Sequence, residues 1–139
     1  MANEIIITCR KVVAGKATGS ALVSTDPIAG WRSLDEENGY ILERNHCLHG
    51  QSIKNRVLVF PFAKGSSGWS QSFHNLALNG GAPAAILIRD INAKSALGVV
   101  LMKCPTVTDF SQDPWAVIET GDTVEVNADE GYVKVYKKE

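Results

Sequence analysis

The sequence predicts a mixed α/β domain in which many short strands and few helices form β/β/α layers. Short β-branched and apolar segments recur along the chain, which is typical of a strand-rich fold. One helical segment lies between two buried strands and therefore predicts a parallel strand pair. Glycines separate the early strands, which indicates a curled or barrel-like sheet.

The first strands are short. Residues 5–9 (Ile-Ile-Ile-Thr-Cys) are β-branched and predict a strand, and Val12-Val13 and residues 21–23 (Ala-Leu-Val) continue the pattern. Gly15 and Gly19 lie between these segments, where we expect the chain to bend.

A long polar segment follows at residues 24–38 and contains Pro27, Gly30 and several acidic residues. Its length and composition predict a functional loop, or a loop that covers a partner surface. Residues 40–42 (Tyr-Ile-Leu) predict a short strand, and residues 45–50 predict a further loop.

The middle of the chain contains the clearest elements. Residues 56–60 (Arg-Val-Leu-Val-Phe) are almost continuously apolar, which predicts a strand buried on both faces and ended by Pro61. A glycine–serine loop at residues 64–68 leads into a predicted helix at about residues 69–78. Gly80-Gly81 supplies the stop of that helix.

The second half alternates strands with one short helix. Residues 84–88 (Ala-Ala-Ile-Leu-Ile) predict a buried strand that completes the strand–helix–strand unit. We expect a short helix at residues 93–97 and a further strand at residues 99–102 (Val-Val-Leu-Met). Residues 123–127 and 132–136 alternate cleanly and predict a closing hairpin.

Length, composition and charge exclude several classes of function. The 139 residues predict one domain, residues 1–139, of ordinary globular composition, with 45% hydrophobic and 21% charged residues. The formal net charge of -1 argues against sequence-independent nucleic-acid binding, which needs a surplus of basic residues. No apolar run approaches the ~20 residues that span a membrane, and the first residues lack a signal-peptide pattern, so we expect a cytoplasmic protein.

The cysteines and histidines predict no metal site built by this chain. Cys9, Cys47 and Cys104 lie far apart and form no C-x-x-C pair, so we expect small apolar side chains rather than disulfides or metal ligands. His46 and His49 lie in a loop without a further nearby ligand, and we expect a surface or turn role for them.

Aromatic and acidic residues elsewhere carry weaker signals. Trp31, Trp69 and Trp115 are spread along the chain, and we expect them to pack in the core or in an interface. Asp35 and the pair Glu36-Glu37 are expected in a solvated loop.

The loop Gly65-Ser66-Ser67-Gly68 is the segment best suited to chemistry. It precedes a helix, where backbone N–H groups and the helix dipole favour negative charge. Ser66 or Ser67 would then lie where an alkoxide or a substrate carboxylate is stabilised. A structural role is the alternative, because serine caps helices and glycines form turns before them. The loop lacks the G-K-[ST] ending of a phosphate-binding P-loop.

Several stretches occur in the order found in one known family. Residues 60–67 (Phe-Pro-Phe-Ala-Lys-Gly-Ser-Ser) and 79–86 (Asn-Gly-Gly-Ala-Pro-Ala-Ala-Ile) flank the predicted helix. Residues 24–28 (Ser-Thr-Asp-Pro-Ile), the H-x-L-x-G-x-S-I stretch that begins at His46, and residues 118–122 (Ile-Glu-Thr-Gly-Asp) agree as well. Together they cover nearly the whole chain, which therefore resembles the small subunit of the aconitase X family.

This resemblance implies a swivelling β/β/α domain similar to the mobile last domain of aconitase. It also implies a hydro-lyase, or dehydratase, in which Ser66 is the catalytic base and Lys64, Gly65 and Ser67 bind the substrate. That role of Ser66 follows from the G-S-S-R type loop of the aconitase domain. The implied partner is a large aconitase X subunit, in a heterodimer or larger assembly. It would hold iron or an iron–sulfur cluster, so that this chain alone binds no cofactor.

Two positions depart from the family pattern. Gly68 stands where aconitase has an arginine that binds a substrate carboxylate, so citrate and isocitrate are not expected as substrates. Residues 30–33 (Gly-Trp-Arg-Ser) replace a commoner G-G-V-D stretch. The single cation Lys64 at this loop and the apolar Trp69 favour cis-3-hydroxy-L-proline, dehydrated to a pyrroline-2-carboxylate, over the alternative substrate mevalonate 5-phosphate.

Two interpretations from other classes stay open. A phosphocarrier swivel domain would use a histidine such as His46 or His74, but Ser66 occupies the place of that histidine in the glycine-rich loop. A structural module would cap a larger chain and would use the serine loop as a helix cap, without catalytic residues.

Overall fold

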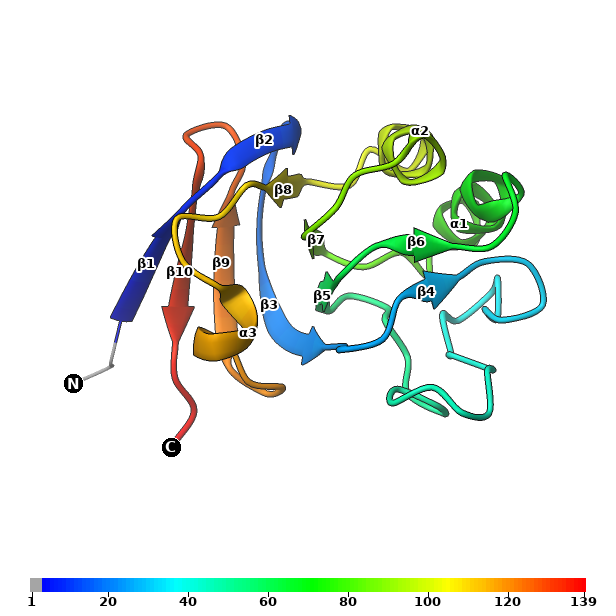
Figure 1. The fold of residues 1–139 in the computed structure, drawn as a ribbon, viewed down its shortest axis with the longest axis horizontal. Coiled ribbons are helices and arrows are strands. Elements are labelled where there is room, and N and C mark those ends of the chain that lie inside the picture. The colour runs from blue at the N-terminus through cyan, green and yellow to red at the C-terminus, as the bar shows by residue number, and fades with distance from the viewer. Residues whose placement is uncertain (1–3) are drawn as a thin grey trace.

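Most of the molecule is an eight-stranded mixed sheet with two helices against one face, as the computed structural model shows (Figure 1). The structure describes residues 4–139. The strands of this sheet are β1 (Glu4–Thr8), β2 (Arg10–Val13), β3 (Lys16–Val23), β5 (Val57–Phe60), β7 (Ala85–Ile88), β8 (Thr106–Thr108), β9 (Thr123–Asn127) and β10 (Tyr132–Tyr136). Two short strands, β4 (Ile28–Ala29) and β6 (Ala63–Lys64), form a separate parallel pair.

The sheet has the strand order β1-β10-β9-β3-β5-β7-β8-β2. In this sheet order, the neighbours β1, β10, β9 and β3 are antiparallel. The strands β3, β5, β7 and β8 are parallel to one another. The edge strands β1 and β2 are consecutive in the chain, and only Cys9 separates them. Because this short step joins the two edges, the sheet curls toward closure. The predicted mixed, barrel-like β/β/α fold is therefore confirmed.

Strand β5 separates two hydrophobic cores. Val57 and Val59 point into the interior of the curled sheet, and Leu58 and Phe60 point toward the helices. All four side chains are 0% exposed. This confirms the prediction of a strand buried on both faces, which follows from its continuous apolar run.

The helices α1 (Trp69–Leu78) and α2 (Ala93–Met102) lie side by side against the sheet, and α3 (Pro114–Val117) is a single turn (Figure 1). Helix α1 lies in the connection between the parallel strands β5 and β7, as predicted. Within residues 4–139, no helix is long and apolar enough to cross a membrane.

The prediction of a strand at residues 99–102 is wrong, because these residues continue helix α2. Asn92 and Ser95 form a capping box that starts this helix, and Lys103 ends it in the left-handed conformation (φ +55°). Gly98 lies at the crossing of the helices, where a Cβ atom would overlap the Trp69 ring. Packing on α1 therefore makes the apolar run helical, although its composition favours a strand.

Smaller differences concern the first half of the chain. Residues 40–42 form no strand and make only isolated bridges, between Leu34 and Ile41 and between Tyr40 and Ser52. Gly19 lies inside β3 instead of interrupting it. Its missing side chain admits the carbonyl oxygen of Asn55, which would lie 3.1 Å from a Cβ atom. The pair β4–β6 was not foreseen, because each strand has two residues.

Candidate functional site

The serine loop connects β6 to α1 and presents two exposed serines. Gly65 has a φ of +93°, in the left-handed region that favours glycine, and it turns the chain away from β6. The Oγ atom of Ser66 accepts a hydrogen bond from the backbone N–H of Gly68 at 3.3 Å. Ser66 and Ser67 are both exposed. The helix cap itself is Gly68, without a side-chain hydrogen bond, so Ser66 is not the N-cap residue of α1.

The base of this loop is held by contacts from three directions. In the β4–β6 pair, Ile28 lies opposite Ala63. The indole Nε1 of Trp69 donates to the carbonyl oxygen of Ile28 at 2.9 Å, and the Nδ2 atom of Asn92 donates to that of Ala63 at 2.9 Å. The serines are thus exposed on a fixed support rather than on a loose segment.

Lys64 lies directly before the loop, and its ammonium group is paired. Its Nζ atom donates to Oε2 of Glu43 at 2.8 Å, and the two side chains are 37% and 30% exposed. The sequence does not reveal this partner, because Glu43 comes from a loop more than twenty residues earlier. The ion pair connects the serine loop to the segment around residue 43.

A hollow of about 410 Å³ opens beside Ser66. The loop after β4 forms one wall, and it is tied to α1 because Oε1 of Glu36 accepts a hydrogen bond from Nδ2 of Asn75 at 2.9 Å. The other wall is the exposed side of α1. The lining residues are Trp31, Glu36, Ser66, Gly68, Gln71, Ser72 and Asn75.

Most of this hollow is not predictable from the sequence. Trp31 is 64% exposed, so it does not pack in the core, and the expectation that it lies in an interface stays a prediction. Glu36 was expected in a solvated loop, and it is bound to α1. Gly30 was the available signal, because a Cβ atom there would lie 2.9 Å from the Cα atom of Trp69. Glycine is the residue that allows such a close approach of the backbone.

The geometry at Ser66 favours negative charge on its Oγ atom, but water around this atom weakens the effect. A hydrogen bond donated by Gly68 N–H to Oγ stabilises an alkoxide more than a neutral hydroxyl. The exposure of Ser66 leaves water around that oxygen, which weakens such electrostatic effects. A second surface that covers the hollow would exclude this water and strengthen them.

One group of residues brings possible metal ligands together, but their atoms are already used. Within residues 4–139, one ligand atom each from Asp26, His46 and Cys47 lie within 4.8 Å of one another. Nδ1 of His46 accepts from the N–H of Leu48 at 3.0 Å, so Nε2 carries the proton and donates to the carbonyl oxygen of Pro27 at 3.0 Å. An Asp26 carboxylate oxygen accepts from Cys47 N–H, and this bond lowers the pKa of Asp26. These contacts hold the loop together.

The cysteines do not fit an iron–sulfur cluster, whose irons are bound by thiolates. Within residues 4–139, Cys9 and Cys104 belong to no cluster of three or more possible ligands, and burial raises the pKa of Cys9 to about 11 and that of Cys104 to about 12. Cys47 is exposed and lies in the loop just described. In the described part of the chain, we therefore assign no residue to an iron or iron–sulfur group.

Known proteins resemble this chain over nearly its whole length. Residues 6–135 match the aconitase X swivel domain. A relative from Methanosarcina mazei, named phosphomevalonate dehydratase small subunit, is 40% identical over 93% of this chain and 90% of its own length. A protein of the same name from Methanothermobacter thermautotrophicus is 36% identical over 92% of this chain and 98% of its own length. The crystal structure of Thermococcus kodakaraensis aconitase X in its holo-form has a TM-score of 0.89 at 32% identity, and the match covers 96% of this chain and 99% of that chain.

Proposed function

The chain belongs to the aconitase X swivel-domain family as a dehydratase small subunit, and on this premise we propose that it serves a phosphomevalonate dehydratase with Ser66 as the base. The observation that carries the role of Ser66 is the setting of its hydroxyl group. Its Oγ atom accepts the Gly68 N–H bond, and the residue is exposed beside a hollow on a firmly held loop. The name of the relatives implies a large subunit as partner.

The proposed role of Ser66 is one half of a dehydration. The Oγ alkoxide takes a proton from the carbon next to the substrate carboxylate, and the electron pair of that C–H bond forms the new double bond. The C–O bond on the next carbon breaks, and the hydroxyl group takes a proton and leaves as water. We assign this second half to the large subunit, because the ionisable side chains near Ser66 already have partners, Glu36 with Asn75 and Lys64 with Glu43.

The proposed substrate differs from the one that the sequence favoured. Relatives that are 31–40% identical carry the name phosphomevalonate dehydratase small subunit, which supports mevalonate 5-phosphate over cis-3-hydroxy-L-proline. One argument for the proline substrate was wrong. Trp69 is only 1% exposed and stacks on Phe73 with ring centroids 3.9 Å apart, so it does not offer its face to a ligand.

The other predicted contacts are kept as part of the proposal. We propose that the backbone at Gly65 and the hydroxyl of Ser67 contact the substrate from the serine loop. Lys64 also contacts the substrate in this proposal, while its ammonium group stays bound to Glu43. An ammonium group has three donors, so this ion pair leaves capacity for a substrate oxygen.

Assays of the assembled pair test the proposal. We expect the chain and the large subunit of the same organism to dehydrate mevalonate 5-phosphate with a higher kcat/KM than cis-3-hydroxy-L-proline. A higher value for the proline compound would reject the proposed substrate and restore the first expectation. Turnover of neither compound would reject both substrates.

The phosphocarrier alternative has no support in the structure. His46 is 6% exposed and both of its ring nitrogens are in hydrogen bonds. His74 lies in helix α1 and is half-buried, outside the glycine-rich loop where a phosphocarrier would need its histidine.

A further inference from the structure

We propose that an apolar surface formed by Trp31, Tyr40 and Leu42 docks the large subunit, with Trp31 as its anchor. We call these three residues the tryptophan face. The inference rests on the proposed function, in which the site at Ser66 is completed by a second chain. It assigns the contact to one segment of this chain.

The tryptophan face exposes large apolar side chains in a short stretch of sequence. Trp31 is 64% exposed, Tyr40 45% and Leu42 48%. Single exposed apolar residues are ordinary on a protein surface, but grouped ones next to a functional loop indicate a contact site. Tryptophan, tyrosine and arginine are the residues most enriched among those that dominate binding energy.

The exposure of these side chains is built into the local fold. Leu34 and Ile41 form a bridge and are buried, at 3% and 1% exposure, so the alternate residues Tyr40 and Leu42 face outward. The N–H of Leu42 donates to the carbonyl oxygen of Ser33 at 2.9 Å. The tryptophan face is therefore presented in a fixed geometry, which lowers the entropy cost of binding.

Two residues connect the tryptophan face to the serine site. Trp31 lines the same hollow as Ser66. Leu42 directly precedes Glu43, whose carboxylate binds Lys64 at the start of the serine loop. A protein seated on this face would thus also cover the hollow and exclude water from Ser66.

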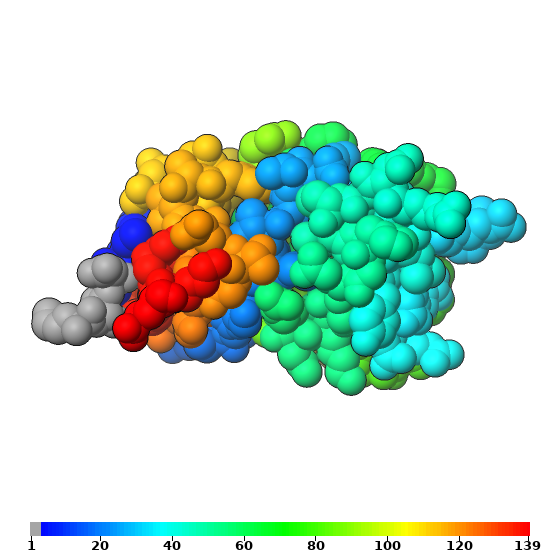
Figure 2. All heavy atoms as spheres, turned by 90° about the horizontal axis from the view of Figure 1, so that it is seen from below, coloured from blue at the N-terminus to red at the C-terminus, as the bar shows by residue number. Residues whose placement is uncertain are grey.

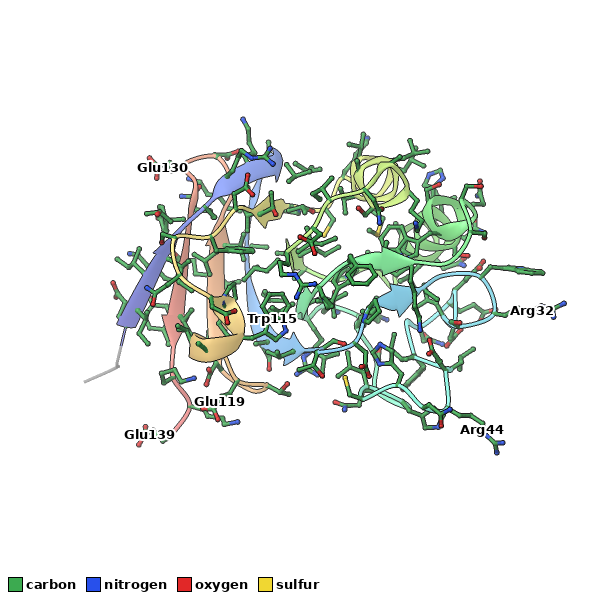
Figure 3. The ribbon with its side chains drawn as sticks, viewed as in Figure 1. Arg32, Arg44, Trp115, Glu119, Glu130 and Glu139 are labelled. Carbon is green, nitrogen blue, oxygen red and sulfur yellow. The ribbon has the colours of Figure 1, made fainter. Side chains whose placement is uncertain are left out.

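Charge indicates the chemistry of the partner surface. The guanidinium carbon of Arg32 lies 4.4 Å from the centre of the Trp31 ring, which is a cation–π contact. Figure 3 shows Arg32 and Arg44 projecting from the same end of the molecule. In Figure 2 the light-blue loop after β4 protrudes at this end. The matching partner surface is an apolar pocket for the indole, with a carboxylate that faces Arg32.

A second exposed apolar group provides the matched control. Leu97, Val100 and Leu101 of α2 are 52%, 56% and 36% exposed. None of the residues that line the hollow comes from α2. Leu97 and Leu42 have the same side chain and nearly equal exposure, so they differ mainly in position.

Binding measurements with the purified large subunit test the proposal. We expect Trp31→Ala to raise the Kd of the pair at least about thirtyfold, which corresponds to an anchor residue of 2 kcal/mol or more. Leu42→Ala should raise it about threefold to tenfold, and Leu97→Ala should leave it unchanged. Thermal melting of each variant should show that the chain stays folded.

The remaining outcomes separate this proposal from the proposed function. If Leu97→Ala weakens the pair and Trp31→Ala does not, the docking surface is on α2 and the tryptophan face is rejected. If Trp31→Ala keeps the Kd but raises KM, the indole is a wall of the substrate site and not an anchor. If the wild-type chain binds no large subunit, the proposed function itself fails.

Discussion

At the scale of single residues, Ser66 depends on its two glycine neighbours. Gly65 adopts a left-handed φ of +93°, and Gly68 donates its N–H to the Ser66 hydroxyl. Serine is a poor base, so its chemistry depends on groups that stabilise the alkoxide. Ser67 is equally exposed but accepts no recorded hydrogen bond through its hydroxyl within residues 4–139. An alanine substitution at Ser67 is therefore a matched control for one at Ser66.

We expect Ser66→Ala to lower the kcat of the assembled enzyme by about 10²–10⁴-fold, because it removes the group that accepts the proton. Ser67→Ala removes at most a supporting hydrogen bond, worth about 0.5–1.5 kcal/mol, and should cost tenfold or less. Steady-state assays at equal assembly measure both values. Equal losses, or a larger loss for Ser67, would contradict the base assignment.

A second residue-scale feature is the buried carboxylate of Asp122 near the end of the chain. Burial by itself raises its pKa, but hydrogen bonds from the ammonium of Lys137 and from the N–H groups of Glu119 and Lys138 outweigh this effect and lower the pKa below 3.8. The Asp side chain is 0% exposed. The ionised form is thus favoured in the folded state.

We expect Asp122→Asn to lower the free energy of unfolding near neutral pH. A carboxyl group whose pKa is lowered by folding stabilises the protein above its unfolded value of 3.8, and this contribution is lost as the pH falls through the folded pKa. The difference in free energy of unfolding between wild type and variant should therefore narrow below about pH 4. Urea unfolding at several pH values measures it. Glu119→Gln is the control, because Glu119 is 69% exposed and its ion pair contributes little.

The cysteines lead to a third prediction at this scale. A triple variant with Cys9→Ser, Cys47→Ser and Cys104→Ala should keep the iron content of the assembled enzyme. Cys9 and Cys104 belong to no cluster of three or more possible ligands within residues 4–139, and burial disfavours their thiolate forms. Elemental analysis of the purified complex measures the iron. Loss of iron with the two subunits still assembled would place a ligand on this chain.

At the scale of elements, the crossing of α1 and α2 places the serine loop. Trp69 begins α1, stacks on Phe73 and donates to Ile28 in β4. Gly98 of α2 leaves the space that the Trp69 ring occupies. One buried indole thus connects two helices and the short strand pair beneath the serines.

We expect Gly98→Ala to destabilise the protein, although alanine is the better helix former by about 1 kcal/mol. The new Cβ atom meets the Trp69 ring, and overpacking of a filled core costs about 1–3 kcal/mol. Urea denaturation should show a lower midpoint. Val100→Ala, on the exposed side of the same helix, should change stability by less than about 0.5 kcal/mol.

At the scale of the whole molecule, the proposed site lies at one end of the fold. The serine loop and the tryptophan face lie at the end formed by α1 and the loop after β4, and β1 and β10 lie at the opposite end (Figure 1). Ser66 is exposed there, and the carboxylate that lines the hollow beside it, that of Glu36, accepts a hydrogen bond from Asn75. This arrangement supports the proposal that a partner completes the site.

We expect the isolated chain to melt cooperatively but to show no dehydratase activity, even with added iron. Activity should appear on titration with the large subunit and should saturate at a fixed ratio of the two chains. A turnover assay on both candidate substrates measures it. Turnover by the isolated chain above the blank would contradict the division of the site between two subunits.

The sequence by itself determined the features that depend on local pattern. Continuous apolar residues predicted β5 and β7, helical spacing predicted α1, and alternation predicted the β9–β10 hairpin. The glycine–serine loop was located for the same reason, because its signal is a run of adjacent residues. These predictions hold since the periods of strands and helices are written in neighbouring positions.

Only the tertiary structure decided which residues surround Ser66. The Lys64–Glu43 ion pair and the hollow shared by Trp31 and Ser66 join residues more than twenty positions apart. Residues 99–102 are helical because α2 packs on α1, which outweighs their strand-like composition. Such contacts depend on how the elements pack, and no local pattern in the chain encodes that packing.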